Sequence, residues 1–96
     1  MAKYVLLIDW TGEGIRAAKE SPQRLDKARE AAKGVGARIE QFYMVMGDHD
    51  MVGILDAPDD EAVATFVLKL SMGGAVRTKT LKAFTEDQYR AILGAL

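Results

Sequence analysis

The sequence has no cysteine, only one histidine and one tryptophan, and only two prolines in 96 residues. Without cysteine there are no disulfides and no thiolate zinc sites, which are the usual marks of small secreted proteins. No apolar run approaches the roughly 20 residues that span a bilayer, and the N-terminus shows no signal-peptide pattern. Basic and acidic residues nearly cancel, at 13 and 14, so electrostatics predict neither a nucleic-acid partner nor an anionic membrane partner. We expect a cytoplasmic protein.

Hydrophobic residues make up 49% of the chain and charged residues 28%. This mixture is typical of a folded globule and argues against disorder. A chain of this length has too little interior for two independent cores. We therefore expect residues 1–96 to form a single domain.

The central stretch, residues 38–56, is predicted to be an antiparallel hairpin. Two runs rich in aromatic and β-branched residues flank four turn formers, Gly47–Asp50, which is a hairpin signature. With positions 48 and 49 at the tip, the register places Tyr43 opposite Ile54 and Val45 opposite Val52. The other side of the ribbon then carries Phe42, Met44, Met46, Met51, Gly53 and Leu55. Both sides are mostly apolar, so both faces of the sheet need a cover.

Periodicity and capping residues predict the remaining elements. They are a strand at 3–10, a short helical turn at 15–19, a helix at 22–33 with Ser21 as N-cap, a helix from about 59 to the glycines at 73 and 74, a strand at 75–84, and a C-terminal helix that follows a Thr85 capping box. The order is β-α-β-β-α-β plus a terminal helix, which predicts a ferredoxin-like α+β fold with a four-stranded antiparallel sheet.

Both main helices lie on one face of the sheet in this fold, which leaves the other face uncovered. A second copy of the chain is the simplest cover for the other face, so we expect a homodimer or a dimer-based oligomer.

Segments along nearly the whole chain carry a resemblance to a known family. They are Tyr4, Trp10-Thr11, Gly14-Ile15, Ser21-Pro22, Arg24, Phe42-Tyr43, Met46, Gly47–Asp50, Ala57–Glu61, Val76–Thr78, Thr80-Leu81 and Ala83–Thr85. Together they resemble the GYD domain family, short bacterial proteins of unknown function. The resemblance implies a fold of the dimeric α/β-barrel type. The chain departs from the family at its Gly-Tyr-Asp signature, because His49, between Gly47 and Asp50, occupies the tyrosine position.

Four residues are candidates for a ligand site. Trp10 and Tyr43 could form the walls of a small-molecule pocket, since aromatic rings offer contact area and a polar tip; the alternative is ordinary packing at a dimer seam. Arg77 and Thr78 could hold an anionic or carbonyl group; the alternative is the polar side of a half-exposed strand. If a functional cavity exists, we expect these four residues to border it.

The signature turn, Gly47–Asp50, contains the lone histidine. His49 between two acidic residues is a conceivable base, pH switch or metal ligand, whereas the plain interpretation is a solvated turn residue. Adjacent side chains in a hairpin diverge, so we expect no metal site. Asp50 is expected to fix the turn through backbone amides.

The sequence contains no recognisable catalytic motif: there is no nucleophile elbow, no Cys-His pair and no Ser-His-Asp triad that the sequence reveals. The leading hypothesis is a small dimeric domain that binds a small organic ligand or acts as an oligomeric regulatory module, with no cofactor. One alternative is an enzyme like the cofactor-independent monooxygenases and isomerases of related fold, an analogy of weak weight. Another is a purely structural self-assembling protein. A cavity with a few converging polar groups favours binding or catalysis, and a filled interior favours assembly.

Overall fold

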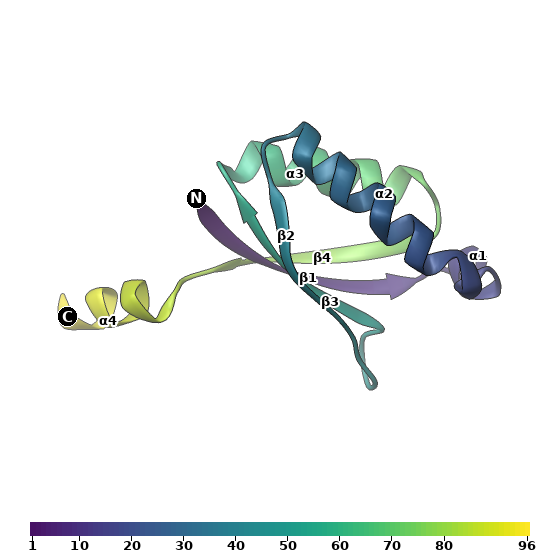
Figure 1. Ribbon diagram of the computed structural model, residues 1–96. Helices are drawn as coiled ribbons and strands as arrows, with labels where there is room; N and C mark the ends of the chain where they lie inside the picture. The colour runs from purple at the N-terminus through teal and green to yellow at the C-terminus, as the bar shows by residue number, and fades with distance from the viewer.

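The computed structural model describes residues 1–96 and consists of a four-stranded antiparallel sheet with two long helices on one face (Figure 1). Along the chain the elements are β1 (Ala2–Trp10), α1 (Gly12–Arg16), the 3-10 turn η1 (Ala18–Glu20), α2 (Ser21–Gly34), β2 (Arg38–Met44), β3 (Met51–Ala57), α3 (Asp60–Met72), β4 (Val76–Ala83) and α4 (Glu86–Gly94). The strands lie in the order β2-β3-β1-β4, and every neighbouring pair is antiparallel. The predicted ferredoxin-like fold with a C-terminal helix is confirmed.

The core lies between the helices and the sheet. Side chains alternate between the two faces of a strand, and in β1 the residues Tyr4, Leu6 and Ile8 are buried on the side of the helices. Phe66 of α3 and Leu55 of β3 are the largest fully buried side chains. The hydrophobic core of the protein therefore lies on the helix-facing side of the sheet.

The start of α2 differs from the prediction. Ser21 already lies inside the helix, the N-cap position is Glu20, and no side chain caps the first turn. The reason is that η1 runs directly into α2. Arg24 donates hydrogen bonds to the carbonyl oxygens of Ala17 (3.2 Å) and Gly14 (3.3 Å). These bonds tie the first turns of α2 to the end of α1, where the Ala17 carbonyl oxygen also accepts from the Glu20 amide at 3.0 Å.

The junction of β1 with β4 accounts for two residues of the family resemblance. The Thr11 hydroxyl donates to the carbonyl oxygen of Gly74 at 2.6 Å and accepts from the amide of Gly14 at 3.1 Å. A Cβ at Gly14 would lie 1.9 Å from the carbonyl oxygen of Ala75. Only glycine therefore allows α1 to approach the start of β4 this closely.

The register of the central hairpin differs from the prediction. Tyr43 pairs with Val52 rather than with Ile54. The strand β2 ends at Met44, so Val45 belongs to the loop. The error amounts to two residues along the strand. Because side chains alternate with a period of two, each residue still lies on the face that was predicted for it.

The cause of the shift is that the loop 45–50 is longer than a two-residue turn. The carbonyl oxygen of Asp50 accepts from the Val45 amide at 2.9 Å, and the Asp50 amide donates to the Ile8 carbonyl oxygen of β1 at 3.1 Å. The Asp50 carboxylate accepts from the amide of Trp10 at 3.0 Å. Asp50 thus fixes the turn through a backbone amide, but that amide belongs to the neighbouring strand.

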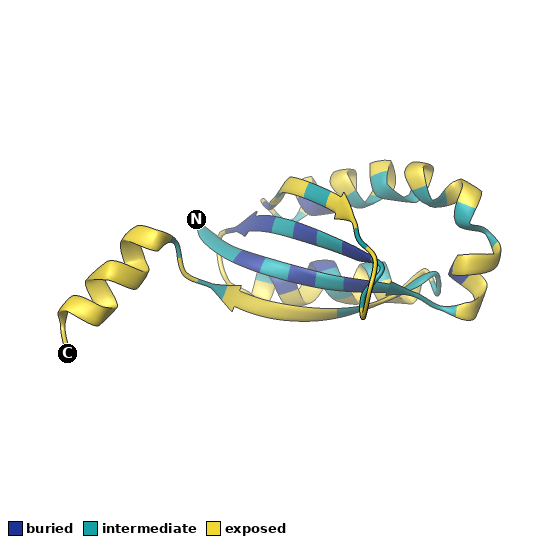
Figure 2. Ribbon diagram, turned by 90° about the horizontal axis from the view of Figure 1, so that it is seen from below, coloured by how far each residue is buried: buried dark blue, intermediate teal, exposed yellow.

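The face of the sheet opposite to α2 and α3 is uncovered in the single chain, and Figure 2 views the molecule from this side. Strand register and alternation assign to this open face the side chains of Tyr43, Val5, Leu7, Val52, Ile54 and Leu81. Across the whole chain thirteen large apolar side chains are exposed, whereas only ten apolar residues are buried. Much of the apolar surface of this protein is therefore left to an additional partner.

The C-terminal helix α4 projects away from the rest of the chain (Figures 1 and 2). The predicted capping box between Thr85 and Gln88 is confirmed. No residue of α4 is buried, and its apolar residues Tyr89, Ile92 and Leu93 are all exposed. No helix of the protein, α4 included, combines the length and the hydrophobicity that crossing a membrane requires.

Candidate functional site

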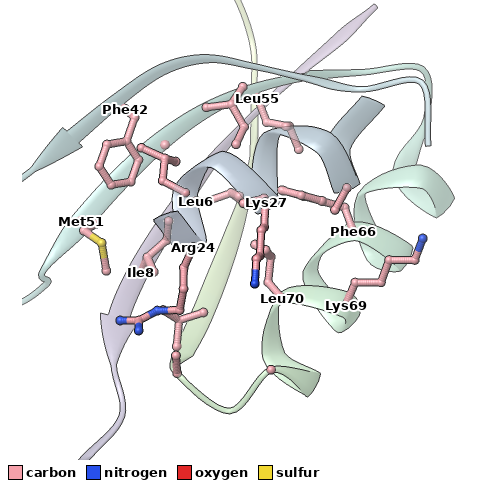
Figure 3. A pocket seen from close by; sticks show the side chains of 18 of the residues that line it. Leu6, Ile8, Arg24, Lys27, Phe42, Met51, Leu55, Phe66, Lys69 and Leu70 are labelled. Atoms are coloured by element: carbon pink, nitrogen blue, oxygen red, sulfur yellow. The ribbon is translucent and has the colours of Figure 1, made fainter. Parts of the chain in front are cut away.

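A cavity of about 390 Å³ lies between α2, α3 and the sheet, and Figure 3 shows its lining side chains. Of the 20 residues that line it, 14 are hydrophobic. The apolar wall comes from the strands and from both helices: Leu6, Ile8, Phe42, Leu55, Phe66 and Leu70. The volume falls within the range of about 300–1,000 Å³ that is typical of small-molecule sites.

The cavity exists because small residues face one another across the gap between α2 and the sheet. Ala28 and Ala31 are the small apolar residues that α2 contributes to the lining, beside the larger Leu25, and Gly53 of β3 also lines the cavity. A Cβ at Gly53 would make ordinary van der Waals contacts at 3.9–4.0 Å with Ile8, Leu6 and the Gln41 carbonyl oxygen. An alanine would therefore fit at this position, and short side chains leave room that leucine or phenylalanine would fill.

All charged residues that line the cavity are basic. Arg24 and Lys27 come from α2 and Lys69 from α3, while no aspartate, glutamate or histidine lines the cavity. Arg24 is engaged with the carbonyl groups at the end of α1. Lys27 and Lys69 are exposed, and neither forms an ion pair. The two lysines are therefore available to a bound molecule.

The four predicted ligand-site residues do not line this cavity. Register and alternation place Tyr43 and Arg77 on the open face and Trp10 and Thr78 on the helix-facing side. Adjacent residues such as 77 and 78 point to opposite faces of a strand. The four residues are therefore divided between the two faces, and any role of theirs in ligand binding stays a prediction.

The signature turn, Gly47–Asp50, is attached to the end of β1. Nδ1 of His49 lies 3.2 Å from Oδ2 of Asp9, and both side chains are about a quarter exposed, at 25% and 26%. The hydrogen bond from His49 is the main cause that lowers the pKa of the Asp9 carboxyl. No group of three or more potential metal ligands exists in the structure. His49 therefore contacts a carboxylate of a neighbouring strand rather than the acidic residues beside it in the sequence.

A second polar cluster joins β1, α3 and β4. The Tyr4 hydroxyl donates to the carboxylate of Asp60 and accepts from Nζ of Lys82 at 3.3 Å. The hydrogen bond to Asp60 is the main cause that raises the pKa of Tyr4. The phenol therefore stays protonated near neutral pH and cannot serve as a base there. This cluster fastens the start of α3 to the sheet.

The chemistry of the cavity suits binding better than catalysis. Its only polar side chains are those of Ser21, Arg24, Lys27 and Lys69, so the lysines are the only groups in the lining that could transfer a proton, and no carboxylate, imidazole or phenol accompanies them. An apolar wall with cationic groups at the opening matches a molecule with an apolar body and an anionic end. The sequence does not reveal this site. Lys27 lies at a position typical of a solvated helix face, and Ala28 and Ala31 have the spacing of residues that pack in an ordinary core.

Comparisons with known proteins agree with the resemblance noted from the sequence. The profile of the GYD domain matches residues 4–93. A relative from Thermus thermophilus is described as a "Glutamine synthetase and cystathionine beta-lyase binding protein". It is 31% identical over 84 residues, which are 86% of this chain and 88% of the relative.

Solved structures with the same fold include TTHA0845 from Thermus thermophilus, which is 28% identical with a TM-score of 0.56 and is matched over 88% of this chain and 95% of its own length. Another is a feast or famine regulatory protein from M. tuberculosis in complex with L-methionine, with a TM-score of 0.68, 16% identity and coverage of 88% of this chain. The chain spans 51% of that protein, and at this identity the likeness concerns the fold alone. By the match over residues 4–93 and by the Thermus relative, this chain belongs to the GYD domain family.

Proposed function

We propose that the chain is a homodimeric regulatory module that binds a small organic molecule in the cavity between its helices and its sheet. The Thermus relative is described as a binding protein for two enzymes. Binding to enzymes is what a regulatory protein does, so this description supports a regulatory role for this chain.

The observation that carries the ligand-binding part is the cavity itself. It combines about 390 Å³ of mostly apolar space with three basic side chains from two helices. A protein that only assembles with itself has no need for such a space, and loosely filled cores cost stability. An empty apolar volume at the main core is therefore better explained by a ligand than by packing.

The open face supports the homodimer. Five aliphatic residues and Tyr43 form its apolar centre, and full burial of such side chains contributes roughly 1–3 kcal/mol each. Charged pairs lie at both ends of this face, Lys3 with Asp56 at one end and Asp9 with His49 at the other. An apolar centre with a polar rim is the usual anatomy of a protein interface. A second copy offers the same surface, so the two sheets would pack face to face about a two-fold axis.

The projecting helix α4 also supports a second copy. Phe84 precedes the helix and is 60% exposed, and the apolar residues of α4 find no surface of their own chain to cover them. In a dimer, α4 of one copy reaches beyond its own sheet and is able to pack on the other copy. The same association would then cover two separate apolar surfaces.

Native mass spectrometry of the protein purified from its own source tests the proposal. We expect the mass of a dimer or of a multiple of it, with an additional mass from a small organic molecule that is released on denaturation. A monomer would contradict the homodimer. A dimer without any added mass, which also fails to take up small organic molecules on incubation, would contradict the ligand site.

An enzymatic function rests on fold analogy alone. Lys27 and Lys69 are the only acid–base groups that line the cavity, and both are exposed. No observation on this chain favours a specific reaction, and we propose none.

A further inference from the structure

The opening of the cavity carries charge of one sign only. Lys27 on α2 and Lys69 on α3 line the cavity, as does Arg24 on α2, and in Figure 3 the side chains of the two lysines point in different directions. Net charge is −1 for the chain as a whole, so this excess of positive charge is local. An anionic group at the opening would be stabilised by charge-assisted hydrogen bonds from the two free ammonium groups.

The interior of the cavity accepts only apolar groups. Leu6, Ile8 and Phe66 form part of its wall, and the only uncharged polar side chain in the lining is Ser21. A buried polar group without a hydrogen-bond partner is strongly unfavourable in an apolar medium. Sugars and other polyols are therefore poor candidates, and the part of a ligand that enters must be a hydrocarbon or aromatic body.

The lining also discriminates against a second, positive charge on the ligand. No aspartate or glutamate lines the cavity, so an ammonium group would lie beside lysines with no carboxylate to pair with. Like charges at close range repel, and a desolvated unpaired charge is strongly unfavourable. A free amino acid such as L-methionine carries an ammonium group next to its carboxylate and is therefore a poor match.

From these observations we infer that the cavity binds small amphiphilic anions, typified by a monocarboxylate with an aliphatic or aromatic body and no amino group. The carboxylate would draw the flexible, exposed side chains of Lys27 and Lys69 toward it at the opening, and the apolar body would lie under α2 against Ile8 and Phe66. This inference rests on the proposed ligand-binding function and specifies its ligand class.

Isothermal titration calorimetry on the full chain tests the inference with four probes: octanoate, octylammonium, 1-octanol and L-methionine. We expect octanoate to bind at least about tenfold more tightly than octylammonium and than L-methionine. The affinity for octanoate should fall with added salt, because the ion pairs at the opening are accessible to solvent.

Lysine variants locate the anionic end. Lys27→Gln and Lys69→Gln should each weaken octanoate binding about three- to tenfold and leave 1-octanol binding unchanged. Lys33→Gln is the matched control, because Lys33 also lies on α2, is exposed and does not line the cavity. It should not change octanoate binding, and circular dichroism would verify that all three variants are folded.

The outcomes separate the ligand class from the function. Equal binding of octylammonium and octanoate, or octanoate binding that neither lysine variant weakens, would overturn the ligand class while the binding site stands. If none of the four probes binds and the native protein carries no small molecule, the cavity is not a ligand site and the proposed function fails as well.

Discussion

The carboxylate of Asp50 accepts a hydrogen bond from the backbone amide of Trp10 at 3.0 Å, which fastens the signature turn of one hairpin to the end of β1. Beside it, the amide of Asp50 donates to the Asp9 carboxylate at 3.2 Å. Two carboxylates, one from each segment, therefore receive backbone amides across the same junction. This arrangement gives the aspartate of the turn a structural role that does not depend on the residue at position 49.

Replacement of Asp50 tests this role. Asp50→Ala leaves the Trp10 amide without its acceptor, and we expect the free energy of unfolding to fall by about 1–3 kcal/mol. Asp50→Asn keeps one acceptor oxygen and should lose clearly less. Urea denaturation followed by tryptophan fluorescence measures both variants. Equal stability of Asp50→Ala and the parent protein would contradict the role of Asp50 at this junction.

His49→Tyr introduces the tyrosine of the family signature. The pair of His49 with Asp9 is partly exposed, and such pairs contribute about 0.2–1 kcal/mol. We therefore expect the variant to fold and to keep its oligomeric state, with a change in unfolding free energy of about 1 kcal/mol or less. Thermal melts and light scattering measure the two quantities. Loss of the dimer in this variant would show that position 49 belongs to the interface.

The ion pairs of Asp56 lead us to expect that the protein loses stability in acid. Its side chain lies 2.7 Å from Nζ of Lys3 and 3.1 Å from Nη2 of Arg38, and Lys3 is the main cause that lowers the pKa of this carboxyl in the fold. Because the pKa of Asp56 is lower in the folded than in the unfolded protein, its ion pairs stabilise the fold fully at any pH above the unfolded pKa of about 3.9. This stabilisation is lost as the pH falls from about 3.9 through the pKa of Asp56 in the folded protein.

The variant Asp56→Asn should therefore be less stable than the parent by about 1–3 kcal/mol at pH 7 and should lose part of the acid dependence below pH 4. Asp48→Asn, at an exposed position in the turn, is the matched control and should change neither quantity. Urea denaturation between pH 2.5 and pH 7 compares the three proteins. Parallel pH profiles for Asp56→Asn and the parent would contradict the prediction.

The open face predicts which substitution would dissociate the proposed dimer. Tyr43 is 54% exposed in the single chain and faces Val52 on this side of the sheet. Tyr43→Asp would bury a lone charge in the interface, and we expect the dimer dissociation constant to rise at least about 100-fold. Met44→Asp is the matched control, because the next residue of the strand points to the opposite face. Light scattering over a concentration series should show a dimer for the control and a monomer for Tyr43→Asp.

The sequence predicts the element order, the antiparallel sheet and the face on which each hairpin residue lies, because these depend on local periodicity and on capping residues such as Thr85. It does not predict the hairpin register. The position of Asp50 is set by hydrogen bonds to β1, which is some forty residues earlier in the chain, and no local turn rule contains that information.

The cavity is likewise beyond the reach of local patterns. Ala28 and Ala31 have the spacing of an ordinary core-facing stripe, and only the tertiary structure shows that they line a cavity together with Gly53. Lys27 and Lys69 lie 42 positions apart on different helices. Their joint position at one opening follows from tertiary packing alone, which is why aromatic and polar residues on the strands were chosen as candidates instead.

The most direct test of the account is to fill the cavity and to measure octanoate binding by calorimetry. Ala31→Leu places a larger apolar side chain in the space under α2, so the variant should be at least as stable as the parent protein and should have lost octanoate binding. Ala64→Leu, at an exposed position of α3 that does not line this cavity, should bind octanoate like the parent. An Ala31→Leu protein that is folded and binds octanoate with unchanged affinity would contradict the claim that this cavity is the ligand site.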